Sequence, residues 1–184
     1  MINVKNLNFS YDKKINIIKN VSFNVAEGEI FGFLGPSGAG KSTLQKILCG
    51  ILLDYRGSVK VFSNEVHNRK DSFYEKIGVD FEFPNLYGKF TGLENLQYFS
   101  SLYGGKVSDP YPLLERIGLL ADADKKVSGY SKGMKMRLAF VRSILHDPDL
   151  LFLDEPTSGL DPENRVELWK EITKLNKEEG TTIF

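Results

Sequence analysis

A glycine-rich stretch early in the chain has the residue types and the spacing of a phosphate-binding loop. It follows the apolar run 30–34 and comprises Gly35, Pro36, Ser37, Gly38, Ala39, Gly40, Lys41, Ser42 and Thr43. In the order strand, glycine-rich turn and helix, backbone N–H groups and a helix N-terminus converge on phosphate oxygens. We expect Lys41 to reach the β- and γ-phosphates, Ser42 to ligate Mg²⁺ and Thr43 to lie near the α-phosphate. The sequence therefore predicts binding of a nucleoside triphosphate.

An acidic pair follows a second apolar run, residues 150–153, which is typical of a parallel strand buried on both faces. Asp154 ends this run, where a carboxylate can hold Mg²⁺ through water. Glu155 comes next and can polarise a water molecule for in-line attack on the γ-phosphate. Taken alone, the pair is equally well explained as a solvated strand end. Together with the phosphate loop it predicts a hydrolytic site with Glu155 and Lys41 as catalytic residues.

The elements that must position these residues change character along the chain. Segments 2–9, 21–25 and 59–61 alternate apolar and polar residues and are separated by short turns, which predicts antiparallel strands. From residue 29 the order becomes strand, phosphate loop and a helix through about Leu52. The last residues, 181–184, are β-branched and aromatic and indicate the start of a strand.

Three further helices are predicted between the two phosphate motifs, and one after them. Thr91 and Glu94 form a capping box, so we expect a helix from there to residues 104–105. Another covers about 111–117, and a third follows Ser131, with apolar residues on one face. Asp161 followed by proline marks the start of the last helix.

The composition excludes several classes of protein. The 184 residues suit one domain, and the 24 basic and 24 acidic residues leave no excess charge and no basic stripe for nucleic acid. Cys49 is the single cysteine, which excludes internal disulfides and favours a reducing compartment. No apolar run approaches the roughly 18 residues that a membrane span needs, and the N-terminus lacks the pattern of a secretory signal. At a membrane, another chain would have to span it.

The residues between and around the two motifs resemble the ATP-binding-cassette ATPases. The segment 130–137 resembles the signature motif of this family: Ser131 and Gly133 match it, whereas Tyr130, Lys132 and Met134 depart from it. Ser131 would cap a helix that can bind an anion at its N-terminus. Residues 156–161 resemble the family's loop at the dimer interface.

Two more positions carry the resemblance. Tyr11 stands at the place of the aromatic residue that stacks on adenine, although a surface tyrosine at a strand end explains it too. Glu82 replaces the usual glutamine, which contacts Mg²⁺ and the attacking water. A carboxylate can still ligate Mg²⁺, but it cannot donate a hydrogen bond.

The resemblance implies an α/β fold: a phosphate-loop NTPase core with a mixed or parallel sheet, an N-terminal antiparallel β subdomain and an inserted α-helical subdomain. The implied division is 1–86 for the β subdomain and nucleotide core, 87–147 for the helical subdomain and 148–184 for the remainder of the core. The implied cofactors are ATP and Mg²⁺. The implied partners are a transmembrane permease subunit and a second ATPase subunit, with the chain on the cytoplasmic face of the cell membrane.

Segments 85–96 and 131–134 resemble the ATPase subunits of exporters of drugs, lipids or ions. One alternative is a soluble cassette ATPase in DNA repair or on ribosomes. The sequence has neither the long heptad run nor the second cassette that would favour this alternative. Another is a nucleotide-binding module without catalysis, which Glu155 argues against. The apolar segment 83–87 is either a surface for the permease or packing beneath the helical subdomain.

The resemblance also implies that the chain stops before a histidine that contacts the γ-phosphate, so we expect slow ATP hydrolysis. His67 and His146 lie elsewhere and lack the spacing of metal ligands. On the same grounds we expect the parallel sheet to end at residues 181–184 in a short, poorly covered edge.

Overall fold

The computed structural model describes residues 1–12, 14–104 and 107–184. Its first sheet is antiparallel, with the strand order β2-β1-β3-β4. The strands are β1 (Ile2–Phe9), β2 (Ile18–Val25), β3 (Tyr55–Val61) and β4 (Asn64–Glu65). The predicted N-terminal strands and their antiparallel pairing are confirmed.

The second sheet is parallel, and it contains β5 (Ile77–Asp80), β6 (Leu150–Leu153) and β7 (Thr182–Ile183) in that order. Residues 29–31 extend it beyond β7. Ile30 forms a parallel bridge with Ile183, and the Phe31 N–H donates to the Ile183 carbonyl at 2.8 Å. Of the predicted strand 30–34, only its first residues therefore pair.

The prediction of a sheet edge at residues 181–184 was wrong. Leu150 pairs with Thr182 on one side of β7, while segment 29–31 pairs with it on the other. The C-terminal strand is thus an interior strand, and the chain leading into the phosphate loop lies at the edge. Leu34 in that chain is 93% exposed.

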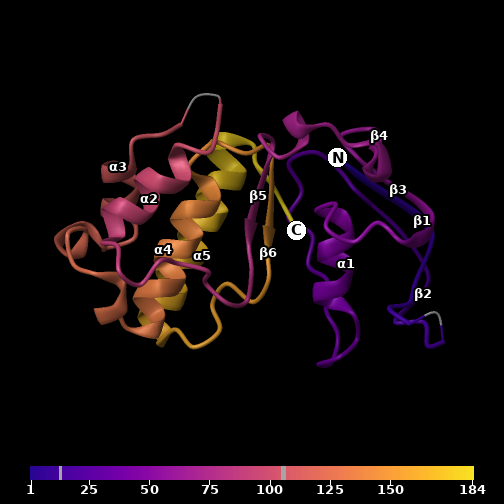
Figure 1. Cartoon of the computed structure of the whole chain (residues 1–184), viewed down its shortest axis with the longest axis horizontal. Helices are drawn as coiled ribbons and strands as arrows, with labels where there is room; N and C mark the ends of the chain where they lie inside the picture. The colour runs from indigo at the N-terminus through magenta and orange to yellow at the C-terminus, as the bar shows by residue number, and fades with distance from the viewer. Residues whose placement is uncertain (13, 105–106) are drawn as a thin grey trace.

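Within the described residues, five α-helices flank the sheets: α1 (Lys41–Leu48), α2 (Gly92–Ser100), α3 (Pro110–Arg116), α4 (Lys132–Ile144) and α5 (Pro162–Glu179). Short 3₁₀ turns cover Val66–Asn68, Asp71–Phe73, Leu120–Asp122 and Val127–Gly129. In Figure 1, α2 to α5 gather on one side of β5 and β6, whereas α1 and the antiparallel sheet lie on the other.

The helices with predicted N-terminal caps begin where those caps place them. Two helices, α1 and α2, end earlier than predicted. The capping box at Thr91 is formed as expected. Helix α1 ends at Leu48 and not near Leu52, because Gly50 takes a left-handed conformation (φ 72). The Ile51 N–H then donates to the Lys46 carbonyl, which closes a Schellman motif.

Helix α2 ends at Ser100 and does not run to residues 104–105, of which residue 105 lies outside the described residues. The Leu102 N–H donates to Phe99 and the Tyr103 N–H to Ser100, so the chain tightens into i to i+3 turns. The Ser101 hydroxyl also donates to the Tyr98 carbonyl, at 2.7 Å.

Strand β6 joins two hydrophobic cores. Leu150 and Phe152 pack with β1, β3 and α1, whereas Leu151 packs with the helices α2 to α5. Successive side chains of a strand point to opposite faces, so the apolar run is buried from both sides. The strand that ends at Asp154 is thereby held by both halves of the molecule.

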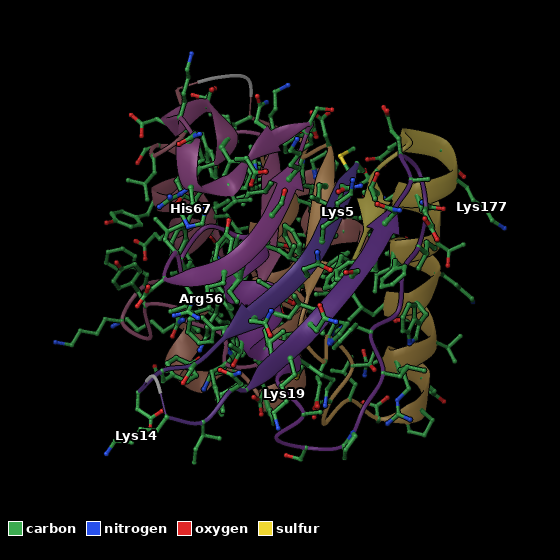
Figure 2. The ribbon with its side chains drawn as sticks, turned by 90° about the vertical axis from the view of Figure 1, so that its right-hand side faces the viewer. Lys5, Lys14, Lys19, Arg56, His67 and Lys177 are labelled. Atoms are coloured by element: carbon green, nitrogen blue, oxygen red, sulfur yellow. The ribbon has the colours of Figure 1, made fainter. Side chains whose placement is uncertain are left out.

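The outer face of the antiparallel sheet is polar. Figure 2 shows this sheet in front of the parallel strands, with Lys5, Lys19 and Arg56 on its three long strands. The alternate residues, such as Val4 and Val59, are buried against α1. None of the helices in the described ranges is long and apolar enough to cross a membrane.

Candidate nucleotide-binding site

The phosphate loop reaches α1 through two glycines in left-handed conformations. Gly38 has φ 79 and Gly40 has φ 92, and Gly40 is the N-cap of α1. No side chain caps the helix, so the N–H groups of its first turn remain available to an anion. A Cβ atom on Gly40 would lie 3.2 Å from the Ile17 Cγ2 atom, so the position has little room for a side chain.

Lys41 and Tyr11 hold the two ends of this loop. The Lys41 Nζ donates to the carbonyls of Gly35 (2.9 Å) and Pro36 (3.0 Å), which leaves one of its three donors for a phosphate. The exposed Tyr11 packs edge-on against Phe9, and its hydroxyl lies 3.2 Å from the Thr43 Oγ1 atom. Tyr11 therefore lies against the first turn of α1.

The acidic pair is placed by the end of the parallel sheet. The Asp154 N–H donates to the Asp80 carbonyl at 3.0 Å, which continues the pairing of β5 and β6 by one residue. Glu155 then has φ 54, and its carbonyl accepts from the Ser158 N–H at 2.9 Å. A left-handed glutamate costs on the order of 1–3 kcal/mol, and such strain concentrates at functional sites.

One cavity of about 380 Å³ brings the two predicted motifs together. Lys41, Asp154 and Glu155 line it, together with Gly35 at the start of the phosphate loop. Its apolar wall is formed by Ile30, Phe31, Phe33, Leu153, Pro156, Trp169, Ile183 and Phe184. Lys41, which is predicted to bind phosphate, and both carboxylates thus face one space, although more than 110 residues separate them in the chain.

Gln45 also lines this cavity, and sequence reasoning did not single it out. It is 4% exposed, and its Nε2 atom is buried without a hydrogen-bond partner in the part of the chain that the structure describes. The available signal was a polar residue at a core-facing position of α1, next to the buried Leu44.

The remaining predicted residues lie outside this cavity. Glu82 is exposed just beyond β5, and Ser131 is the N-cap of α4, where its Oγ accepts from the Met134 N–H at 3.2 Å. Gly133 lies in the first turn of that helix. Neither they nor Tyr11 line the space between Lys41 and Asp154.

Tyr130, which departs from the signature pattern, has a structural role. Its hydroxyl donates to the Asp122 carbonyl at 2.6 Å, and the residue is buried. A Cβ atom on Gly92 would lie 2.4 Å from the Tyr130 hydroxyl oxygen. The tyrosine therefore fits because residue 92 has no side chain.

Asp80 is a buried carboxyl beside the site. Its pKa is raised to about 7: burial is the main cause, Asp154 also raises the pKa, and the nearby Arg142 lowers it. Arg142 donates to the Asn85 carbonyl at 2.7 Å and lies over the Phe99 ring. Arg142 near the end of α4 is thus close enough to affect the Asp80 carboxyl, and it also contacts the segment 83–87 through Asn85.

That segment borders a groove of about 650 Å³ between β5 and the helices. The groove is lined by Cys49, Ile51, Tyr74, Ile77, Val79, Phe81, Asn85, Leu86, Tyr87, Phe99, Tyr103, Arg142 and Ser143. Leu86 packs against the helical core, whereas Phe83 is 71% exposed. The packing interpretation therefore holds for Leu86, whereas a permease surface at the exposed Phe83 stays a prediction.

Both histidines contact backbone and aromatic rings. The Nε2 atom of His67 lies 2.6 Å from the Leu53 carbonyl, and that of His146 lies 2.9 Å from the Ile77 carbonyl. His146 also stacks on Tyr103. Within the described ranges, no three His, Cys, Asp or Glu residues cluster as metal ligands.

The fold and this cavity define an α/β nucleotide-binding domain of the phosphate-loop class. The family model described as ABC transporter matches residues 18–158. The chain belongs to this family, and the predicted fold class is confirmed.

Several relatives cover the whole chain. A fluoroquinolones export ATP-binding protein of Mycobacterium tuberculosis is 52% identical over 185 residues, which are 100% of this chain and 61% of that protein. A bacitracin transport ATP-binding protein of Enterococcus faecalis is 38% identical, with 100% and 60% covered. The chain thus spans about three fifths of the length of these curated relatives. A dimeric ATP-binding cassette, solved in a post-hydrolysis state with ADP and Pi, superposes with a TM-score of 0.87 at 29% identity, covering 100% of this chain and 86% of that one.

Proposed function

We propose that this chain binds ATP with Mg²⁺ and hydrolyses it to power an exporter in the cell membrane. The observation that carries the proposal is the cavity that Lys41, Asp154 and Glu155 share. A cation for phosphate, a carboxylate for a metal ion and a carboxylate for water are the parts that phosphate-loop hydrolysis needs. The division into units 1–86, 87–147 and 148–184 belongs to the same proposal.

The residues present fit Mg²⁺ with ATP. The Ser42 hydroxyl and the Asp154 carboxylate are hard oxygen donors, and Mg²⁺ is bound through one or two such side chains plus phosphate oxygens and water. Glu82 is the third proposed ligand, and it is exposed beside the end of β5.

In the proposed hydrolysis, phosphate binding, proton transfer and further charge stabilisation are carried out by different groups. Lys41 and the uncapped first turn of α1 hold the phosphates and stabilise the charge that develops on them. Glu155 accepts the proton of the attacking water as general base. Mg²⁺, when bound, supplies further positive charge at the phosphate oxygens.

We further propose that two cassettes enclose the nucleotide. Tyr11 would stack on adenine, because it lies against the first turn of α1 with its ring exposed. Ser131 and Gly133, at the N-terminus of α4, would face the γ-phosphate held by a second ATPase subunit. The dimeric state of the solved relative with ADP and Pi supports this arrangement.

The proposed partner in the membrane is a permease subunit that inserts a short helix into the groove beside Phe99 and Arg142. Relatives named for export of fluoroquinolones and transport of bacitracin support a cargo of the drug, lipid or ion class. The chain would then lie on the cytoplasmic face of the membrane.

Calorimetry with Mg-ATP tests nucleotide binding at the loop. Lys41→Ala should weaken ATP binding by about 10-fold or more, because hydrogen bonds to charged groups contribute about 1.5–3 kcal/mol. Lys46→Ala is the matched control, since it removes the same charge from the last turn of the same helix. Equal affinities of the two variants would remove Lys41 from the site.

Crosslinking tests the coupling to a membrane partner. Asn85→Cys should crosslink to a co-expressed permease, whereas Lys177→Cys, on the exposed side of α5, should not (Figure 2). The native Cys49 is buried, and its burial raises the pKa of the thiol, so it should not react. An active ATPase that crosslinks at no groove position and carries no membrane partner would favour a soluble ATPase.

A further inference from the structure

Gln45 lines the cavity with a buried amide, and the roles proposed for Lys41, Asp154 and Glu155 do not involve this amide. Its Nε2 atom is inaccessible and has no hydrogen-bond partner among the described residues. Burying an amide without a partner is unfavourable, so buried polar groups normally have one. A partner is therefore expected among the groups that fill or line the cavity in the working protein.

The position of Gln45 limits which group this is. It lies four residues after Lys41 on α1, so the two side chains share one face of the helix and both line the cavity. The amide can rotate to present either its nitrogen or its oxygen.

The side-chain acceptors that line the same cavity are the carboxylates of Asp154 and Glu155. Asp154 is half-buried at the end of β6, whereas Glu155 is exposed and leaves the strand with φ 54. The buried Gln45 amide in the cavity wall is therefore better placed to donate a hydrogen bond to Asp154 than to Glu155.

We propose that Gln45 is a positioning residue that donates a hydrogen bond to the Asp154 carboxylate when the magnesium–nucleotide complex is bound. The inference rests on the proposed function of this site. Carboxylates that ligate metals are themselves oriented by hydrogen bonds, and loss of such a partner typically costs 10–100-fold in metal affinity. Gln45 would thus set the orientation of the carboxylate without touching the metal or the nucleotide.

The test separates metal binding from nucleotide binding. Gln45→Met keeps the length of the side chain and removes the amide, and Gln45→Leu is a second variant with the same loss. Gln97→Met, on the exposed face of α2, is the control. Binding of a fluorescent ATP analogue is measured first in EDTA, and the free Mn²⁺ signal in electron paramagnetic resonance then gives the metal affinity of the complex.

Both Gln45 variants should bind the analogue in EDTA as the wild type does and bind Mn²⁺ about 10–100-fold more weakly. Their unfolding temperature without ligand should be unchanged or higher, because an unpaired buried amide is lost. Unchanged Mn²⁺ affinity in either folded variant would overturn the inference while leaving the proposed function intact. A wild type that shows no metal-dependent nucleotide binding would overturn both.

Discussion

The substitution Gly40→Ala tests whether the left-handed conformation of Gly40 is needed to form the phosphate loop. Its φ of 92 is a conformation that side chains disfavour by about 1–2 kcal/mol. Gly40→Ala would also place Cβ 3.2 Å from the Ile17 Cγ2 atom. Part of this cost is offset because alanine restricts the unfolded chain, by about 0.4–1 kcal/mol. We expect a net loss of about 1 kcal/mol, which lowers the unfolding temperature by about 2–4 °C for a chain of this size.

The effect on ATP affinity should be larger than the effect on stability. Gly40 caps α1, so a backbone that turns to relieve strain moves the first N–H groups of the helix away from the phosphates. Losing one hydrogen bond to a charged phosphate costs about 1.5–3 kcal/mol, which is about 10- to 150-fold in affinity.

Gly180→Ala is the matched control for this experiment. Gly180 has φ 75 at the C-cap of α5, and apart from its chain neighbours no described residue has an atom within 4 Å of the added Cβ. Both variants should lose similar stability, but only Gly40→Ala should lose ATP affinity in calorimetry, at a temperature where both are folded. If Gly40→Ala binds Mg-ATP as tightly as Gly180→Ala, the conformation of Gly40 does not build the site.

Three further outcomes follow from the same geometry. Glu155→Gln should slow single-turnover hydrolysis by about 10²–10⁴ and leave ATP affinity unchanged, because an amide cannot accept the proton of water; a rate near that of the wild type would exclude Glu155 as the base. The folded-state pKa of Asp80, about 7, lies above its usual value of 3.8, so the folded protein holds the proton more tightly and stability should fall as pH rises from about 4 to 7. Asp80→Asn should therefore reduce the loss of unfolding temperature between pH 5 and pH 8, and an unchanged loss would contradict the assignment. Gly92→Ala should cost about 1–3 kcal/mol in denaturant unfolding through its clash with the Tyr130 hydroxyl, and Tyr130→Phe in the same background should recover part of it; equal losses with and without the hydroxyl would show that the clash is relieved elsewhere.

Short sequence patterns predicted the helix starts, because these are formed by residues close together in the chain. The capping box at Thr91 and the Asp161–Pro162 pair placed the starts of α2 and α5, because a cap is formed by residues within four positions of one another. The helix ends were less predictable. At α1 the left-handed Gly50 ended the helix, and a glycine is compatible with either outcome.

The sheet edge shows where such patterns stop being informative. Residues 181–184 were recognisable as a strand, but the order of strands depends on which segments pair across the fold. Segment 29–31 pairs with β7 from a position about 150 residues earlier in the chain, and no local periodicity records that neighbour. The strand predicted to be an edge is therefore an interior one.

By itself, the sequence determined that a phosphate loop, an acidic strand end and a strand–helix order typical of an α/β NTPase exist in this chain. Each of these is contiguous, so residue types and spacing suffice to identify it. Only the tertiary structure decided that Lys41, Asp154 and Glu155 share one cavity and that Gln45 is sealed in its wall. The physical reason is that a cavity and a buried amide arise from packing between α1 and the ends of distant strands, which spacing along the chain does not specify.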